Sequence, residues 1–218
     1  MMATTVYFIR HGETYFNRFA RLQGWSDTPL TAKGQEDAVK IAKVLAPLKI
    51  NYFFSSDLKR AIDTGQIIID QLKLPNISHP TQQKCFREVF YGSFEGYSNE
   101  EGAIWASYLG GKRFRRIGDL VAEFGVKKAH DFLKQADPAH LAEDSAELDQ
   151  RVGQMLDLFA SLPPESNVVV ASHGSIIQYL ATVFGNRNQY ENPANGALMK
   201  LIIKDHHARV AGYNQFAI

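Results

Sequence analysis

The chain has 218 residues, of which 45% are hydrophobic and 22% charged, as is ordinary for a soluble globular chain with a substantial core. Its formal net charge of +1 at pH 7 gives no sign of a surface for nucleic acid or for acidic membranes. Any anion-binding site must therefore be local and built from a few converging cations.

The cysteine content and the N-terminus bear on the compartment. A single cysteine, Cys85, excludes an internal disulfide and a cysteine zinc site, and it fits a reducing cytoplasm. The N-terminus has no basic segment followed by an apolar core and a small-residue cleavage site, which is the pattern of a secretion signal. We therefore expect a cytoplasmic protein with neither nucleic acid nor a membrane as its partner.

The first half of the chain alternates predicted strands and helices. Residues 4–9 are β-branched and aromatic and predict a buried strand, which an irregular loop follows at 19–30. Thr31 is the expected N-cap of a helix that closes at Pro47. Residues 51–55 predict a second strand, and a strongly periodic helix runs from Ser56 to Pro75.

The second half begins with a less regular region. Residues 83–86 could be extended, and residues 98–141 look helical but irregular, with helices expected at 103–109 and 126–135. We interpret residues 97–141 as a helical insertion that could act as a lid. Asp144 and Glu147 resemble a capping box ahead of an apolar stripe that ends at Pro163.

The last part of the chain predicts a buried strand at 167–172, then a helix through Phe184, then strands at 198–203 and 208–213. Alternating strands and helices predict an α/β fold in which a mostly parallel central sheet is covered on both faces, a three-layer α/β/α arrangement. We expect residues 1–218 to form a single domain that includes the insertion.

Three predicted strands lead into arginine or histidine residues that could bind or react with a ligand. The strand at 4–9 runs into Arg10-His11-Gly12, and the strand at 167–172 runs into His173-Gly174. The strand at 51–55 leads to Arg60 in the first turn of the next helix. If these strands are neighbours, their side chains meet in the crevice beyond the carboxyl ends of the strands, where ligands bind in open α/β sheets.

Two guanidiniums and two imidazoles in one crevice suit a dianion, most simply a phosphoryl group. Gly12 lacks a Cβ, and we expect it to let a ligand approach the backbone closely. The alternative for each residue is structural: Arg60 could be a solvated helix residue and His173 a core histidine.

Taken in chain order, these motifs resemble one family. The motifs are Arg10-His11-Gly12-Glu13-Thr14, then Asn17, the segment 55–61 (SSDLKRA), Glu88 ahead of Tyr91-Gly92, and Ser172-His173-Gly174. Together they resemble the histidine phosphatase superfamily, most closely the branch that contains cofactor-dependent phosphoglycerate mutases and broad-specificity phosphatases. The resemblance covers nearly the whole chain and weakens between residues 98 and 141. It implies a phosphoglycerate mutase-like fold.

The resemblance also implies roles for individual residues. His11 is expected to attack phosphorus and become phosphohistidine, and Glu88 to protonate the leaving oxygen. Glu13 and Glu95 are rival acids, of which we interpret Glu13 as a structural hydrogen-bonding residue. The residues expected around the substrate are Arg10, Asn17, Gln23, Gly24, Arg60, Glu88, Tyr91, His173 and Gly174.

These roles agree with the chemistry of phosphoryl transfer, which requires mainly positioning and charge stabilisation from the protein. A neutral histidine is a competent nucleophile, and we expect the flanking cations to keep His11 unprotonated. We expect its second ring nitrogen to donate to a backbone carbonyl. We expect no metal, because no His-Glu-x-x-His spacing occurs and paired arginines repel a divalent cation.

The same site could serve a phosphatase, a mutase or a non-catalytic phospholigand sensor. Mutases of this family place a lysine shortly after the Gly-rich stretch, where Asn99 stands here, and an arginine pair followed by prolines. Arg115-Arg116 could supply the pair, but Ile117-Gly118 follows, and the basic cluster formed with Lys112 and Arg113 could simply be a solvated face.

These departures favour a phosphatase that acts on a small phosphorylated metabolite. We expect it to need no cofactor, whereas a mutase would need 2,3-bisphosphoglycerate as a primer. A complete catalytic set argues against a mere sensor, because binding alone requires no acid. A homodimer is possible.

Overall fold

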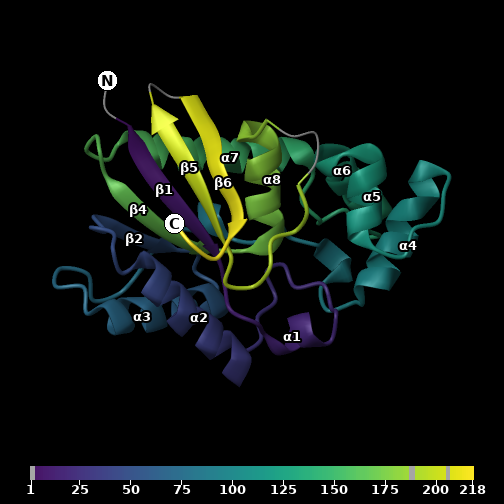
Figure 1. Ribbon diagram of the computed structural model, residues 1–218. Helices are drawn as coiled ribbons and strands as arrows, with labels where there is room; N and C mark the ends of the chain where they lie inside the picture. Colours follow the sequence, from purple (N-terminus) through teal and green to yellow (C-terminus); the bar gives the residue numbers. More distant parts are fainter. Residues whose placement is uncertain (1–2, 187–189, 205–206) are drawn as a thin grey trace.

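The computed structural model describes residues 3–186, 190–204 and 207–218 and is built around one six-stranded sheet (Figure 1). The order of its strands is β3-β2-β4-β1-β5-β6. Their bounds are β1 (Thr4–Arg10), β2 (Tyr52–Ser55), β3 (Thr81–Gln82), β4 (Asn167–Ser172), β5 (Leu198–Lys204) and β6 (His207–Gln215). The predicted strands at 4–9, 51–55, 167–172, 198–203 and 208–213 are thereby confirmed.

The strands β3, β2, β4 and β1 are parallel to one another, and β5 and β6 extend the sheet in antiparallel fashion. The three strands that end in chemistry-bearing residues are therefore adjacent, with β4 between β2 and β1. Arg10 at the end of β1 is in register with Ser172 at the end of β4. The residues that follow these two, His11 and His173, consequently leave the sheet side by side.

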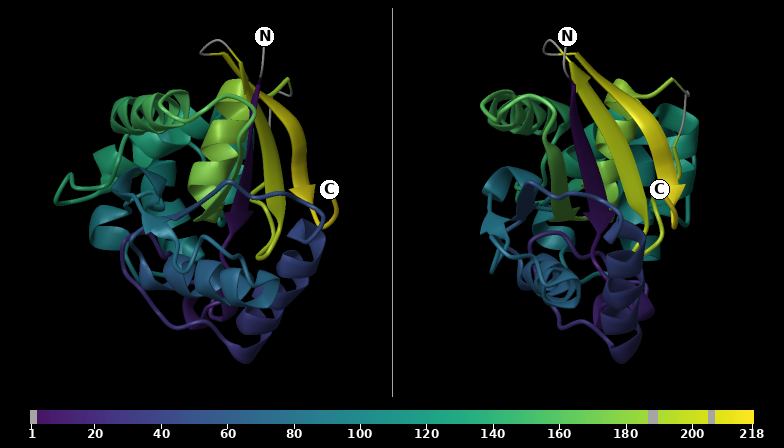
Figure 2. Two further views of the ribbon diagram at one scale, coloured as in Figure 1. Left: turned by 90° about the vertical axis from the view of Figure 1, so that its left-hand side faces the viewer. Right: turned by 60° about the vertical axis from the view of Figure 1, so that its left-hand side comes forward.

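Helices cover both faces of the sheet, as the two views of Figure 2 show. On one face, α2 (Ala32–Leu45) and α3 (Lys59–Leu72) bury Ile41 and Ile68 against Ile9 and Val169. On the other, α7 (Ser145–Ala160) and α8 (Gly174–Phe184) pack against the alternate residues of the same strands, such as Phe8. Because successive side chains of a strand point to opposite faces, the central residues of β1 and β4, 6–9 and 168–171, are hydrophobic without interruption. The α/β prediction with a doubly covered sheet is confirmed.

Several predicted helix boundaries are confirmed. The Thr31 side chain caps α2 by accepting from the amide of Gly34. Asp144 and Glu147 form the predicted capping box of α7. The helix predicted from Ser56 begins at Lys59 instead, because Leu58 is still extended.

The region between β2 and α7 differs most from the expectation. Residues 84–86 form a single 3-10 turn, η1 (Lys84–Phe86), which buries Cys85 and Phe86 together, so the extended segment predicted at 83–86 is wrong. A second turn, η2 (Gly92–Phe94), follows. The helix expected at 103–109 is α4 (Asn99–Gly110), which starts earlier because Ser98 and Glu101 form a capping box.

Two helices were not anticipated, α5 (Ile117–Phe124) and the short α1 (Tyr15–Arg18), whereas α6 (Val126–Ala136) matches its prediction. α5 buries Leu120 and Val121, and α4, α5 and α6 lie together beside the sheet (Figure 1). Within the described residues, no helix has the length and apolar character needed to cross a membrane.

Candidate active site

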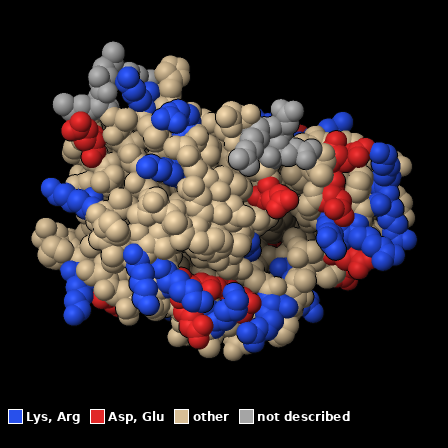
Figure 3. Space-filling view, viewed as in Figure 1, with Lys and Arg blue, Asp and Glu red and all other residues tan. Residues whose placement is uncertain are grey.

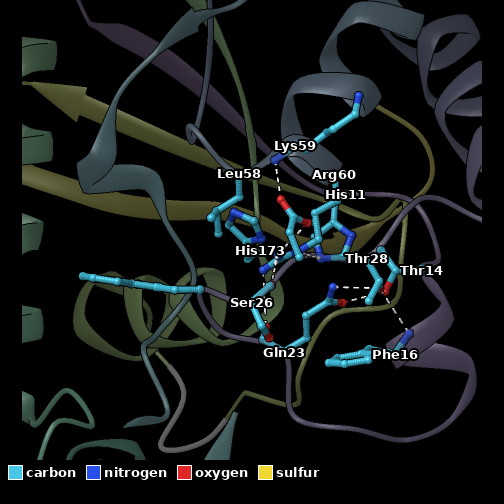
Figure 4. A network of polar contacts seen from close by, with 12 residues as sticks. His11, Thr14, Phe16, Gln23, Ser26, Thr28, Leu58, Lys59, Arg60 and His173 are labelled. Carbon is cyan, nitrogen blue, oxygen red and sulfur yellow. Dashed lines mark hydrogen bonds and ion pairs between the residues drawn. The ribbon is translucent and has the colours of Figure 1, made fainter. Parts of the chain in front are cut away.

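The adjacent ends of β1 and β4 bring His11 and His173 together. Their ring centroids lie 5.1 Å apart with the planes inclined by 61°, and both side chains are buried. Figure 4 shows the two rings grouped with Arg60, which enters from the first turn of α3. Three sheet-end segments, far apart in the chain, thus supply one cluster, as the sequence predicted.

The hydrogen bonds of His11 define its tautomer. Its Nδ1 lies 2.8 Å from the carbonyl oxygen of Gly12, and its Nε2 receives a hydrogen bond of 3.2 Å from Nε of Arg60. A carbonyl can only accept and a guanidinium can only donate, so Nδ1 carries the hydrogen and Nε2 the lone pair. The expected hydrogen bond to a backbone carbonyl is therefore present.

The electrostatics of the cluster keep both imidazoles neutral. Burial lowers the pKa of His11 well below its ordinary value, and the charges of Arg60 and Arg10 add to that effect. Burial likewise leads in lowering the pKa of His173, followed by Arg60. The sequence interpretation attributed the neutral state to the flanking cations, whereas desolvation is the larger cause.

Arg60 is fully buried, so the alternative of a solvated helix residue is wrong. Besides its bond to His11, its guanidinium donates to the carbonyl oxygen of Gly24 at 2.7 Å and to Oδ1 of Asp27 at 3.1 Å. It also donates to the carbonyl oxygens of Ser26 at 2.9 Å and Gln23 at 3.3 Å. The loop at 23–27 therefore fixes the arginine in one orientation.

His173 is held by the third strand end. Its Nε2 lies 2.7 Å from Oγ of Ser56, directly after β2. Its Nδ1 is buried with no hydrogen-bond partner in the described part of the chain.

Arg10 is positioned by the segment that follows α8. One of its terminal nitrogens donates to Oδ1 of Asn192 at 2.7 Å and to the carbonyl oxygen of Pro193, while its Nε is buried without a described partner. A Cβ at Gly174 would lie 3.1 Å from the guanidinium carbon and 2.4 Å from Oδ1 of Asn192. Gly174 therefore makes room for the guanidinium.

Glu88 lies at the N-terminus of α8. Its Oε2 accepts from the amide of Ser175 at 3.0 Å, and its Oε1 accepts from the amides of Ile176 at 3.0 Å and Val89 at 2.9 Å. Amide hydrogens and the positive end of the helix dipole hold a carboxylate here in one orientation. The carboxyl group is buried but lines the cavity described below.

The two rival acids have structural partners. Glu13 accepts from Oγ1 of Thr31 at 2.8 Å and pairs with Arg18. Glu95 accepts from the backbone amides of Gly24 and Tyr91 and so joins two loops. In the described part of the chain, neither carboxylate lines the cavity that Glu88 reaches.

A cavity of about 410 Å³ opens onto this cluster. Figure 3 shows a hollow between the sheet and the α4–α6 helices, with basic side chains inside it and an acidic side chain on its rim. The cavity is lined by Arg10, His11, Asn17, Arg21, Leu22, Gln23, Glu88, Tyr91, Asn99, Arg116, Ile117, Gly118, Val121, His130, Ser175, Gln178, Asn192 and Asn195. Arg60 and His173 lie behind this wall and are fully buried. Its volume suits a small metabolite.

The remaining predicted substrate residues divide into two groups. Asn17 and Tyr91 line the cavity, the tyrosine hydroxyl lying 2.7 Å from Oγ of Ser175. Gln23 also lines it, but its amide is bonded to Thr14 and Thr28. Gly24 contributes its carbonyl to Arg60 instead.

Gly12 has a different role from the one expected. A Cβ at this position would lie 2.0 Å from the carbonyl oxygen of Gly34, so the space is occupied by the first turn of α2 rather than by a ligand. The expectation of a close ligand approach at Gly12 is therefore wrong. The glycine instead allows the loop after β1 to pack against the backbone of the next helix.

The basic cluster in the helical insertion is divided. Arg116 and Asn99 line the cavity. Arg115 pairs with Glu100 at 3.6 Å and is 76% exposed, and Lys112 pairs with Glu123. The predicted arginine pair therefore contributes one residue to the cavity and one to the surface.

Sequence reasoning missed several residues of the cavity wall. They are Arg21, His130, Ser175, Gln178 and Asn192. Asn192 stands in an irregular segment with no periodic signal, and His130 lies in a helix whose interior face could not be told from its sequence alone. Within the described residues, no cluster of three or more His, Cys, Asp or Glu side chains could hold a metal ion.

Comparisons with known proteins agree with this geometry. The family model described as the histidine phosphatase superfamily (branch 1) matches residues 6–215. The probable phosphoglycerate mutase GpmB of Erwinia tasmaniensis is 30% identical over 186 residues, which cover 83% of this chain and 74% of that protein. GpmB of an Enterobacter species is 31% identical with the same coverage.

Solved structures share the fold. A phosphoglycerate mutase from Bacillus anthracis superposes with a TM-score of 0.91 at 26% identity, covering 99% of this chain and 94% of that one. The alpha-ribazole phosphatase from Shigella flexneri superposes with a TM-score of 0.69 at 22% identity, covering 98% of each chain. The predicted phosphoglycerate mutase-like architecture is confirmed.

Proposed function

Because this chain belongs to the histidine phosphatase superfamily, we propose that it hydrolyses a small phosphorylated metabolite through a phosphohistidine at His11. The observation that carries the proposal is the hydrogen bonding of His11, whose Nδ1 donates to the carbonyl oxygen of Gly12 while the unprotonated Nε2 accepts from Arg60. A neutral imidazole fixed in this tautomer is ready to attack phosphorus.

In the first step, Nε2 of His11 forms a bond to phosphorus as the ester P–O bond breaks. Glu88 donates a proton to the departing oxygen, so that an alcohol leaves. The guanidinium of Arg10, which lines the cavity, and that of Arg60, directly behind His11, stabilise the charge on the phosphoryl oxygens.

In the second step, water attacks the phosphoryl group and the P–N bond breaks. Glu88 takes the proton of that water, which returns the acid and releases inorganic phosphate with a neutral His11. The position of Glu88 on the same cavity wall as His11 supports this double role. Hydrolysis by this route needs no cofactor.

A second candidate is a phosphoglycerate mutase, the name carried by the relatives and by the Bacillus anthracis structure. Arg116 on the cavity wall favours it, because a carboxylate-bearing substrate needs a further cation. Two features favour the hydrolase: Asn99 is uncharged, and Arg115 pairs with Glu100 at the surface. Among the described residues of the insertion, Arg116 is therefore the one cation that lines the cavity.

Two assays on the purified protein separate these functions. Release of phosphate from p-nitrophenyl phosphate in the presence of EDTA is the result expected for the hydrolase. Interconversion of 2- and 3-phosphoglycerate that depends on 2,3-bisphosphoglycerate would establish the mutase instead. If the protein catalyses neither reaction but still binds inorganic phosphate, it is a phospholigand sensor and the proposal is overturned.

A further inference from the structure

His130 is a buried histidine on the cavity wall for which the proposed mechanism has no use. It lies on α6, with 2% of its surface exposed, and it is one of the residues that line the cavity. Its small accessible surface therefore opens on the cavity. The other buried residues of this helix, such as Leu133, pack into the hydrophobic core.

The hydrogen bonding of the ring is incomplete. Nδ1 is buried and has no hydrogen-bond partner within the described residues. The ring packs near Tyr179, with centroids 6.3 Å apart and the planes inclined by 58°. Buried polar atoms in native proteins normally have a partner, so an imidazole at a cavity wall with a vacant nitrogen indicates a polar group on the ligand.

The charge state of His130 narrows the chemistry of that group. Burial lowers its pKa to about 4, and the smaller opposing effect of Asp131 is partly offset by the charge of Arg151, so the ring is neutral near pH 7. In a neutral imidazole, Nδ1 is a donor in one tautomer and an acceptor in the other, and a hydroxyl can pair with either. The neutral ring offers no charge to attract a second phosphate or a carboxylate.

The rest of the cavity wall mixes basic side chains, Arg21 and Arg116, with uncharged ones. Gln178 is buried and lines the same cavity, and Asn99 lines it from the start of α4. Val121 and Ile117 add apolar surface. The cationic groups of Arg10 and Arg60 gather around His11, where the phosphoryl group belongs.

We propose that His130 hydrogen-bonds a hydroxyl group on the alcohol part of the substrate and so selects phosphate monoesters of polyhydroxylated alcohols over simple alkyl esters. This inference rests on the proposed hydrolase function. It assigns His130 as a specificity residue that has no part in the transfer of the phosphoryl group. A site built to bond a hydroxyl discriminates against analogues without it, because its polar group is then left unpaired.

The test compares two substrates of equal carbon number, glycerol 1-phosphate and n-propyl phosphate. We expect the wild type to have the higher kcat/KM on glycerol 1-phosphate. His130→Leu should reduce the ratio of the two kcat/KM values about tenfold, as the loss of one hydrogen bond predicts. His130→Asn, which keeps a donor and an acceptor on a shorter side chain, should restore part of the preference.

Phe132→Leu on the same helix is the matched control, since Phe132 packs against Phe124 in the core at a ring distance of 5.2 Å. It should lower the melting temperature without changing the substrate ratio. An unchanged ratio in both folded His130 variants would overturn the inference and leave His130 as a packing residue. If His130→Leu does not fold, the ratio measured for His130→Asn decides.

The hydrolase function is tested separately by p-nitrophenyl phosphate, whose ring carries no hydroxyl for His130. No release of phosphate from this ester by the wild type would refute the hydrolase itself. Normal release, together with an unchanged ratio in the variants, would refute only the role of His130.

Discussion

Nε of Arg60 donates a hydrogen bond of 3.2 Å to Nε2 of His11, the atom that we propose attacks phosphorus. This hydrogen bond engages the lone pair of Nε2. Because the loop at 23–27 fixes the guanidinium through its terminal nitrogens, we expect the oxygen of a bound phosphoryl group, a stronger acceptor than an imidazole nitrogen, to take over the bond at the same place. The same exchange would free the nucleophile as the transition state forms.

His11→Ala should abolish turnover and covalent labelling by a phosphorylated substrate, because it removes the imidazole that lines the cavity next to Arg10. The measurement is steady-state release of phosphate, together with recovery of an acid-labile, base-stable phosphoprotein after rapid quenching. Label that survives in the variant would move the nucleophile to His173, whose ring lies 5.1 Å away.

Glu88→Gln should slow the hydrolysis of an alkyl phosphate by about 10²-fold, and that of p-nitrophenyl phosphate much less, because only a poor leaving group needs a proton. The amide retains the size of the side chain. Glu13→Gln is the matched control, since that carboxylate bonds Thr31 and Arg18 instead. Equal losses on the two substrates would show that Glu88 is not the proton donor.

Arg151→Lys should displace Glu88 without touching the substrate. The buried guanidinium of Arg151 donates to the carbonyl oxygens of Arg87 and Glu88 and to Oε2 of Glu143, and so secures the segment that carries the acid. A lysine cannot make all these bonds, and unsatisfied buried acceptors cost about 1–3 kcal/mol of unfolding free energy.

Two measurements check this expectation. Urea denaturation should show the loss of stability. The rate of hydrolysis should fall more for an alkyl phosphate than for p-nitrophenyl phosphate, because a misplaced acid protonates a poor leaving group less well. A loss of stability with unchanged sensitivity to the leaving group would make Arg151 structural only.

The meeting of the site residues could be predicted from the sequence, because parallel strands bring their carboxyl ends to the same edge of the sheet. That reasoning correctly joined His11, His173 and Arg60. It could not place the wall formed by Arg21, Asn192 and the helices α5 and α6, whose positions depend on contacts with each other rather than on local periodicity. Gly12 was misjudged for the same reason, since its neighbour Gly34 is adjacent only in space.

Gly12→Ala should destabilise the protein by about 1–3 kcal/mol, as overpacking does, because the added methyl meets the carbonyl of Gly34 at 2.0 Å. Backbone atoms cannot swing aside as a flexible side chain can. Gly153→Ala on α7 is the control, since a Cβ there meets nothing within 4 Å and should if anything add stability. Equal unfolding free energies for Gly12→Ala and the wild type would contradict this account.

Stability should fall as the pH drops below about 6.5, the ordinary pKa of histidine. Burial lowers the pKa of His11, His130 and His173, so the unfolded chain takes up protons that the folded chain does not. The free energy of unfolding should then decrease by up to about 1.4 kcal/mol per pH unit for each of these residues.

For His130, whose pKa is lowered to about 4, this window extends from about pH 6.5 down to about pH 4. Urea denaturation at several pH values between 7.5 and 5 measures the slope. His130→Leu should make it shallower, whereas His79→Gln, at an exposed position, should not. If the free energy of unfolding varies with pH by the same slope in the wild type and in His130→Leu, the lowered pKa of His130 is contradicted.

The cavity wall has two origins. Arg10, His11 and Glu88 stand at or near the ends of the central strands and helix α8, whereas Asn99, Arg116 and His130 come from helices that pack beside the sheet. Substitutions in these outlying helices can therefore alter which alcohol is accepted while the bond-breaking apparatus stays intact. Because of this division, exchanging the helical insertion alone, a stretch of about forty residues, would give enzymes with different substrate specificities on one scaffold.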